Sequence, residues 1–217
     1  MKTIKGAAFD MDGLMFETES IHYREAEILL NRRGFAYTEQ LFLDTLGCPP
    51  EPCFRKFIET YTLPETWEEL AKESENIFLE LLQNGCEYMP GLCGLLDALD
   101  AARIPKCVAT SSSKRVADAI LTKDDIAKRF SFVLTCEDIV RGKPDPQIYL
   151  LAAERLGIQP GELAVFEDSS AGVASAKGAG AACIALRAEH NKNADLSGAD
   201  LVVSALDAEG VLERIHG

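Results

Sequence analysis

Two carboxylates stand two residues apart directly after the first apolar run of the chain, in the segment FDMDG at residues 9–13. In a continuing strand, Asp10 and Asp12 would point to the same face, where two like charges repel. The pair therefore marks either a solvated strand end or a place where something nearby makes the clustering useful. Both acids suit chemistry, because one Asp can act as a nucleophile while a second carboxyl donates and accepts a proton.

Short apolar runs recur along the chain without the polar alternation of a half-exposed strand. Such runs are typical of buried parallel strands. Helical patterns lie between them at 92–102, 146–156 and 171–179, and Gly157 and Gly180 end the last two. This alternation predicts an α/β fold with a doubly wound parallel sheet. The predicted strands are 6–9, 106–110, 132–135, 163–166, 182–186 and 201–203.

Polar side chains follow the predicted strands where each strand ends. In a doubly wound sheet, ligands bind beyond the carboxyl ends of the strands, so these residues should share one rim. A hard divalent cation such as Mg²⁺ would account for the acids, since it prefers oxygen ligands and often also binds substrate phosphate. Phosphoryl transfer then suits the lysine and the hydroxyls, which would hold phosphoryl oxygens. The residues are Asp10, Asp12, Thr110, Ser111, Ser112, Lys143, Glu167 and Asp168.

Residues 18–84 interrupt the alternation of strands and helices. Thr18 or Ser20 can begin a helix that runs to Arg33, and a longer apolar stripe follows Trp67. Helices without a strand, inserted after the first strand, predict a helical cap domain. The predicted domains are an α/β core of residues 1–16 and 86–217 and a cap of residues 17–85.

Composition and charge exclude several classes of protein. The 217 residues carry a net charge of −13 and no basic run, which argues against binding to nucleic acid. No apolar segment is long enough to cross a membrane or to form the core of a signal peptide. Seven cysteines without a CxxC pair indicate free thiols in a reducing compartment. We therefore expect a cytoplasmic protein, monomeric or weakly homo-oligomeric, that binds a small phosphorylated metabolite.

Four segments together resemble the sequence motifs of the haloacid dehalogenase superfamily, in the same order. They are FDMDG at 9–13, the apolar run ending in Thr110 and Ser111, GKPDP at 142–146, and VFEDS at 165–169. The resemblance spans the whole chain, including the inserted helices, and is closest to the β-phosphoglucomutase-like phosphatases. It implies a Rossmann-like core, a helical cap, and a Mg²⁺-dependent phosphatase that works through an aspartyl-phosphate. The implied substrate is a sugar phosphate or a nucleoside monophosphate.

The resemblance also implies roles for individual residues. Asp10 would be the nucleophile and Asp12 the general acid and base. Lys143 would pair with both Asp10 and the phosphate. The phosphate-binding hydroxyl of the second motif falls on Ser111, and Thr110, one residue earlier, is the alternative.

The implied metal site answers the question that the paired acids raise. Mg²⁺ would be bound by Asp10, the backbone carbonyl of Asp12, and Asp168, with Glu167 nearby or acting through water. The acids are then tolerable because the metal and Lys143 compensate their charge, and they differ in role because Asp12 must carry a proton.

Several positions depart from the mutases of the same subfamily. His22 lies where those enzymes carry a functional cap histidine. However, Pro50 and Ser74 stand where they use an Arg and a Lys to hold a second phosphate. This favours hydrolysis over a phosphosugar mutase. Glu17 replaces the Asp usual after the first motif, at the hinge into the cap, where an extra methylene can change the fit of the substrate.

Each motif also has a purely structural explanation. The acid pair can be a solvated strand end, and Lys143 can be an ordinary loop lysine before a turn. Glu167, Asp168 and the serines at 111–113 can cap the helices that follow them, and His22 can be a structural residue. A non-enzymatic binding module on the same fold is a third alternative to the phosphatase. The four motifs in order favour catalysis.

Overall fold

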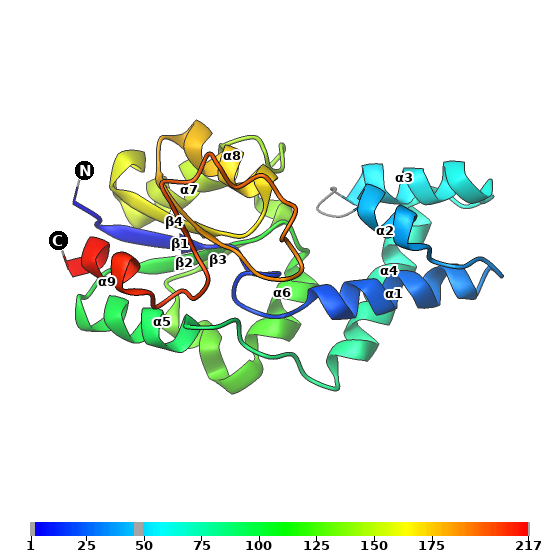
Figure 1. Ribbon diagram of the computed structural model, residues 1–217, viewed down its shortest axis with the longest axis horizontal. Helices are drawn as coiled ribbons and strands as arrows, with labels where there is room; N and C mark the ends of the chain where they lie inside the picture. The colour runs from blue at the N-terminus through cyan, green and yellow to red at the C-terminus, as the bar shows by residue number, and fades with distance from the viewer. Residues whose placement is uncertain (1–2, 46–49, 217) are drawn as a thin grey trace. The chain divides into compact units, whose positions relative to one another are not determined.

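A computed structural model describes residues 3–45 and 50–216 (Figure 1). The chain forms two compact units, one of residues 1–17 and 87–217 and the other of residues 18–86. We call them the sheet unit and the helical unit.

In the described residues, no helix has the length and apolar character needed to span a bilayer. The six cysteines in the described ranges are all free thiols, and Cys48 lies outside those ranges.

The sheet unit contains six parallel strands among the described residues, in the order β3-β2-β1-β4-β5-β6. The order confirms the predicted doubly wound sheet. Successive strands are added on opposite sides of the adjacent pair β1 and β4, which is therefore the topological switch point where such folds bind ligands. The strands are β1 (Gly6–Phe9), β2 (Lys106–Ala109), β3 (Val133–Leu134), β4 (Leu163–Glu167), β5 (Ala182–Leu186) and β6 (Leu201–Val203).

Helices cover both faces of this sheet, with α7 and α8 on one side and α5 and α9 on the other (Figure 1). The α-helices are α5 (Leu92–Ala101), α6 (Lys114–Leu121), α7 (Gln147–Leu156), α8 (Ser170–Ala179) and α9 (Glu209–His216). Short 3₁₀ helices are η1 (Lys123–Arg129), η2 (Cys136–Asp138) and η3 (Pro160–Glu162). The predicted helices at 92–102, 146–156 and 171–179 match α5, α7 and α8 to within one residue at each end.

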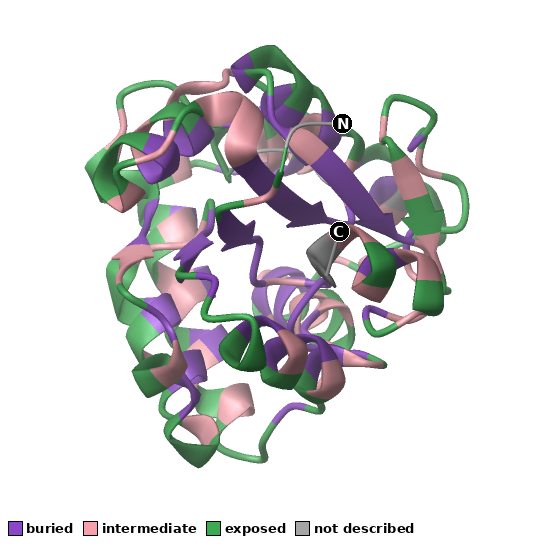
Figure 2. Cartoon of the chain, turned by 90° about the vertical axis from the view of Figure 1, so that its left-hand side faces the viewer, coloured by how far each residue is buried: buried purple, intermediate pink, exposed green. Residues whose placement is uncertain are grey.

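Small side chains bring α7 and α8 close to the sheet. Strand residues Ala8, Cys107 and Ala185 pack with Ala152 and Ala176 of the helices in one buried cluster. Small side chains at such a contact let backbones approach closely while the interior stays densely packed. The central strands β1, β2 and β4 are buried along their whole length, as the purple strands in Figure 2 show. Elements held this firmly provide a rigid base for the side chains at the strand ends.

The helical unit consists of α1 (Glu19–Asn31), α2 (Glu39–Thr45), α3 (Pro50–Tyr61) and α4 (Trp67–Leu82). The sequence predicted α1 and α4 but assigned no bounds to the helices between them. Thr18 is the N-cap residue of α1, one of the two predicted starts, although its side chain makes no capping hydrogen bond there. Ser20, the other predicted start, lies inside the helix. The four helices enclose a core that includes Leu29, Phe57, Leu70 and Ile77.

Gly91 begins α5 with a left-handed backbone, at φ = 80°. A Cβ atom at this position would lie 2.5 Å from the backbone nitrogen of Asp207 and 2.7 Å from that of Leu206. Gly157 has a similar φ of 71°, but a Cβ there would meet nothing within 4 Å. Comparing alanine substitutions at the two glycines therefore distinguishes the energetic cost of a left-handed backbone from that of a clash with a neighbouring backbone.

We expect Gly91→Ala to lower the free energy of unfolding by clearly more than Gly157→Ala. Left-handed backbone alone costs an L-residue about 1–2 kcal/mol, and overpacking against a rigid backbone adds about 1–3 kcal/mol at position 91. Urea unfolding of both variants measures the difference. Equal losses would show that the segment at 206–207 moves aside easily.

Candidate active site

The carboxyl ends of β1 and β4 place three acids side by side at the switch point. Asp10 directly follows β1, Glu167 is the last residue of β4, and Asp168 follows it. The backbone nitrogen of Asp10 donates to the carbonyl oxygen of Phe166 at 3.0 Å, which continues the pairing of the two strands. Strand register therefore brings Asp10 next to Glu167, although 157 positions separate them in the sequence (167 − 10).

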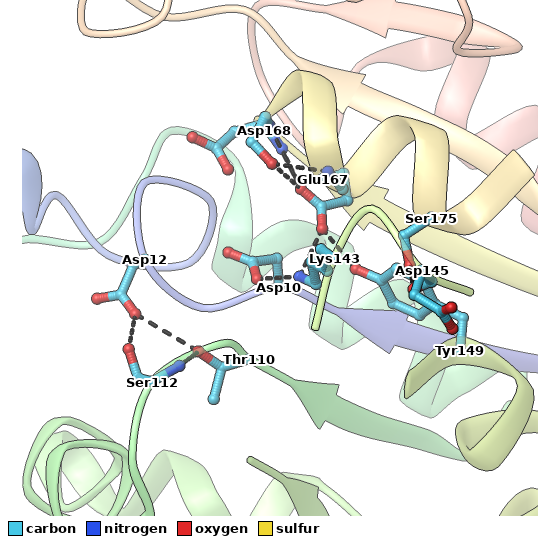
Figure 3. Close-up of polar contacts among 12 residues, drawn as sticks. Asp10, Asp12, Thr110, Ser112, Lys143, Asp145, Tyr149, Glu167, Asp168 and Ser175 are labelled. Atoms are coloured by element: carbon cyan, nitrogen blue, oxygen red, sulfur yellow. Dashed lines mark hydrogen bonds and ion pairs between the residues drawn. The ribbon is translucent and has the colours of Figure 1, made fainter. Parts of the chain in front are cut away.

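Lys143 lies at the centre of this cluster, on the loop before α7 (Figure 3). Its buried Nζ donates to Asp10 Oδ1, and it donates to Glu167 Oε1 at 2.6 Å. It also lies 5.2 Å from the ring centroid of Tyr149, which stabilises a buried cation further. The pairing with Asp10 is the one that the sequence motif implies, and the structure adds Glu167 and Tyr149 as partners.

Glu167 is fully buried and accepts hydrogen bonds on both carboxylate oxygens. Oε1 accepts from Lys143 Nζ and from the hydroxyl of Tyr149 at 2.5 Å. Oε2 accepts from the backbone nitrogens of Asp168 at 3.1 Å and Ser169 at 3.3 Å, and from the Ser169 hydroxyl at 3.1 Å. These donors lie where α8 begins, and the positive end of a helix dipole favours a carboxylate there. Glu167 thus joins Lys143, α7 and the start of α8.

The pKa values in the cluster shift according to how each charge is compensated. Burial raises the pKa of Asp10 well above its usual value, and the nearby charges of Glu167 and Asp168 add to the rise while Lys143 opposes it. Burial acts in the same direction on Glu167, but the charge and hydrogen bond of Lys143, together with the hydrogen bonds of Tyr149 and Ser169, lower its pKa. Burial would lower the pKa of Lys143, yet Asp10 and Glu167 raise it. The surroundings of Glu167 therefore favour its charged form, whereas burial disfavours the charged form of Asp10.

The three acids fit a hard divalent cation. Carboxylate oxygens of Asp10, Glu167 and Asp168 all lie within 4.8 Å of one another, and all three residues are buried. Oxygen donors with excess negative charge are the ligands that Mg²⁺ takes. Since Glu167 already receives hydrogen bonds on both oxygens, Asp10 and Asp168 are the side chains best suited to bind the ion directly.

The loop after β5 supports Asp168. The ring nitrogen Nε2 of His190 lies 2.8 Å from Asp168 Oδ2, and Asn191 Nδ2 donates to the Asp168 carbonyl oxygen at 2.7 Å. Gly13 lies against the same group at φ = 72°, and a Cβ there would overlap with the Asp168 carboxylate and lie 2.9 Å from His190. The sequence motifs identified Asp168 but neither His190 nor Asn191.

Asp12 has partners different from those of Asp10. Its carboxylate points toward the loop after β2, where the Ser112 hydroxyl donates to Oδ2 at 2.6 Å (Figure 3). The buried Thr110 hydroxyl lies 3.5 Å from the same oxygen. Ser111, the predicted phosphate ligand, is exposed. The structure thus brings Thr110 and Ser112 to Asp12. The sequence placed Ser112 at this rim but gave it no role of its own, and the assignment of the phosphate ligand stays a prediction.

Two predicted substrate residues, His22 and Glu17, make their described contacts within their own units. His22 belongs to α1, where its Nδ1 lies 3.0 Å from Glu25 Oε2 and its ring stacks on Phe78 at a centroid distance of 4.6 Å. These contacts account for His22 within the helical unit. Glu17 ends the first segment of the sheet unit, and its backbone nitrogen donates to the Glu87 carbonyl oxygen at 2.9 Å. Roles for His22 and Glu17 in substrate binding stay predictions.

Comparison with known proteins places these residues in a family context. The profile of a family described as "Haloacid dehalogenase-like hydrolase" matches residues 7–186. A "Probable pseudouridine-5'-phosphatase" of Drosophila melanogaster is 33% identical over 186 residues, which cover 83% of this chain and 80% of that protein. A "Phosphorylated carbohydrates phosphatase" of Thermotoga maritima is 33% identical over 181 residues, covering 82% of each.

Solved structures share the fold over the full length. The crystal structure of CbbY from Rhodobacter sphaeroides in complex with phosphate superposes with a TM-score of 0.87. The alignment covers 99% of this chain and 100% of that chain at 23% sequence identity. At this identity the likeness concerns the fold alone.

Gly172, in the first turn of α8, leaves the space that the Glu167 side chain occupies. A Cβ at position 172 would overlap with the Glu167 carboxylate, whereas a Cβ at Gly178 in the same helix would lie 3.4 Å from Pro146, an ordinary contact. We expect Gly172→Ala to displace Glu167 and to lower the unfolding free energy by about 1–3 kcal/mol. Gly178→Ala should raise it by about 0.5–1 kcal/mol, because alanine favours a helix interior.

Urea unfolding of both variants tests this expectation. Opposite signs for the two substitutions support a tightly enclosed Glu167. Stabilisation by Gly172→Ala as well would contradict it, since helix propensity would then outweigh any contact with the carboxylate.

Proposed function

Because the chain belongs to the haloacid dehalogenase-like hydrolase family, we propose that it is a Mg²⁺-dependent phosphatase of small phosphorylated metabolites. The relatives named above support this activity, since one is described as acting on phosphorylated carbohydrates and the other as a pseudouridine-5'-phosphatase. The substrate class is accordingly a sugar phosphate or a nucleoside monophosphate. A small anion also suits a chain of net charge −13, because positive charge is concentrated at Lys143 and at the cation.

One observation carries the proposal: two acids of the same short turn have different surroundings. Asp10 is buried and pairs with Lys143, whereas Asp12 is held by hydroxyls of another loop. Two carboxyls in different environments can take the two roles that ester hydrolysis requires, a nucleophile and a proton carrier. A module that only binds phosphate would have no need of both.

The reaction would proceed in two displacements. Asp10 attacks phosphorus, a P–O bond forms to its carboxylate, and the ester P–O bond breaks while Asp12 protonates the departing oxygen. Water then attacks the aspartyl-phosphate, Asp12 takes up the water proton, and phosphate leaves with Asp10 restored. Lys143 holds Asp10 and contributes positive charge to the phosphoryl oxygens.

Mg²⁺ would be held by Asp10, Asp168 and the backbone carbonyl of Asp12. Glu167 would remain paired with Lys143 beside them. The bound ion would neutralise charge that develops on the transferring phosphoryl group. His190 and Asn191 keep Asp168 in place for this task. We interpret the helical unit as the substrate-specificity cap of such an enzyme, inserted between residues 17 and 87.

Two positions in the helical unit support hydrolysis over transfer between sugars. Ser74 stands where the mutases carry a Lys, and it is a buried residue of α4. Pro50 stands where they carry an Arg, and it is the first residue of α3. Neither supplies the positive charge that a second phosphate group requires. Water is therefore the proposed acceptor of the phosphoryl group.

Phosphate release from a panel of phosphorylated sugars, nucleotides and short acids tests the proposal. We expect release to require Mg²⁺ and to fall on the order of 10³-fold or more in Asp10→Asn, because the nucleophile is lost. Asp118→Asn, which alters an exposed acid paired with Lys114, is the control and should retain full activity. Chelation by EDTA should abolish release, and added Mg²⁺ should restore it.

Two results would contradict the proposal: an Asp10→Asn variant as active as wild type, or no release from any compound. In the second case, transfer from a sugar bisphosphate to a sugar monophosphate should be assayed, because a mutase would show that activity instead.

A further inference from the structure

The mechanism above gives Ser112 itself no role, although its hydroxyl holds Asp12. Ser112 Oγ donates to Asp12 Oδ2 at 2.6 Å, and the two residues lie 100 positions apart in the sequence. A hydroxyl that donates to a carboxylate at this distance makes a strong, charge-assisted hydrogen bond. The contact joins the loop after β2 to the loop after β1, beside the proposed reaction centre.

The backbone of Ser112 is held on both sides. Its nitrogen donates to the buried Thr110 hydroxyl at 3.0 Å, and its carbonyl oxygen accepts from the Cys136 nitrogen at 3.1 Å. Its neighbour Ser113 has a different task, because its hydroxyl accepts from the Val116 nitrogen at 3.2 Å and caps α6. The Ser112 hydroxyl therefore reaches Asp12 from a preorganised backbone.

Both printed contacts of the Asp12 carboxyl come from the same loop. Ser112 and, more weakly, Thr110 approach Oδ2, which lies on the side of the loop after β2 (Figure 3). This loop therefore holds the Asp12 carboxyl in one orientation.

We propose that Ser112 is a positioning residue that orients the Asp12 carboxyl for proton transfer to the leaving group. This inference rests on the proposed function. When the ester P–O bond breaks, its electron pair goes to the alkyl oxygen, which takes the proton of the Asp12 carboxyl. Asp12 becomes a carboxylate that Ser112 continues to hold. An alkoxide leaves poorly without that proton, whereas a nitrophenolate leaves readily.

Substrates with different leaving groups distinguish a role of Ser112 in proton transfer from a role in phosphate binding or in folding. The value of kcat/KM reports the steps up to departure of the leaving group, so it should be measured for a sugar phosphate and for p-nitrophenyl phosphate. We expect Ser112→Ala to lower kcat/KM for the sugar phosphate about 10- to 100-fold, a part of the effect of general acid catalysis. The value for p-nitrophenyl phosphate should change less than about threefold. Ser112→Thr keeps the hydroxyl and should restore most of the activity on the sugar phosphate.

A double-mutant cycle shows whether Ser112 acts through Asp12. In an Asp12→Asn background, Ser112→Ala should have no further effect on the sugar phosphate. An additional loss there, or equal losses on both substrates, would overturn the inference, because Ser112 would then act on the phosphate or on the fold.

Failure of this inference is distinguishable from failure of the proposed function. If the wild type hydrolyses the sugar phosphate in a Mg²⁺- and Asp10-dependent manner and Ser112→Ala matches it, only the role of Ser112 is wrong. If the wild type hydrolyses neither substrate, the phosphatase proposal is wrong and the role of Ser112 falls with it.

Discussion

The buried ammonium group of Lys143 is the charge on which the rest of the site depends. It neutralises Glu167 and contacts Asp10, both of which the sheet removes from water. Burying an unpaired carboxylate costs several kcal/mol, and this lysine offsets that cost for Asp10 and Glu167 at the ends of β1 and β4. Tyr149 supports the arrangement from α7 by donating to Glu167 and by facing the ammonium group with its ring. A helix that lies on one face of the sheet thereby contributes to the electrostatics at the carboxyl ends of the strands.

Close packing gives this charge cluster its geometry. Alanines and cysteines bring α7 and α8 near the strands, and Gly172 gives the Glu167 carboxylate room against the first turn of α8. Gly13 likewise lets the turn after β1 approach Asp168 and His190. At such contacts even one additional carbon atom would displace a charged group, and a displaced charge loses its hydrogen bonds. Packing and electrostatics are therefore coupled at these glycines.

The division of labour between the paired acids follows from which loop each one meets. Asp10 and Asp12 leave the same strand end, but strand pairing directs the first toward Lys143, and the turn directs the second toward Ser112 and Thr110. Different partners give two residues of the same type different surroundings. In the proposed mechanism, this difference would place a nucleophile and a proton carrier within three residues of each other.

Local signals in the sequence were sufficient for the sheet and most of its helices. They also pointed to the four motif residues Asp10, Asp12, Lys143 and Asp168, whose roles stay predictions. Apolar runs, glycine stops and helical periodicity act over a few residues, so they can be read without a structure. Long-range contacts could not be read in this way. Tyr149 reads as one more apolar residue of a helix and Ser112 as a possible helix cap, yet their hydroxyls meet Glu167 and Asp12, and only strand register and helix docking decide such meetings. A buried tyrosine hydroxyl needs a partner, but the identity of that partner is a property of the tertiary structure, because it depends on which chain segments pack side by side.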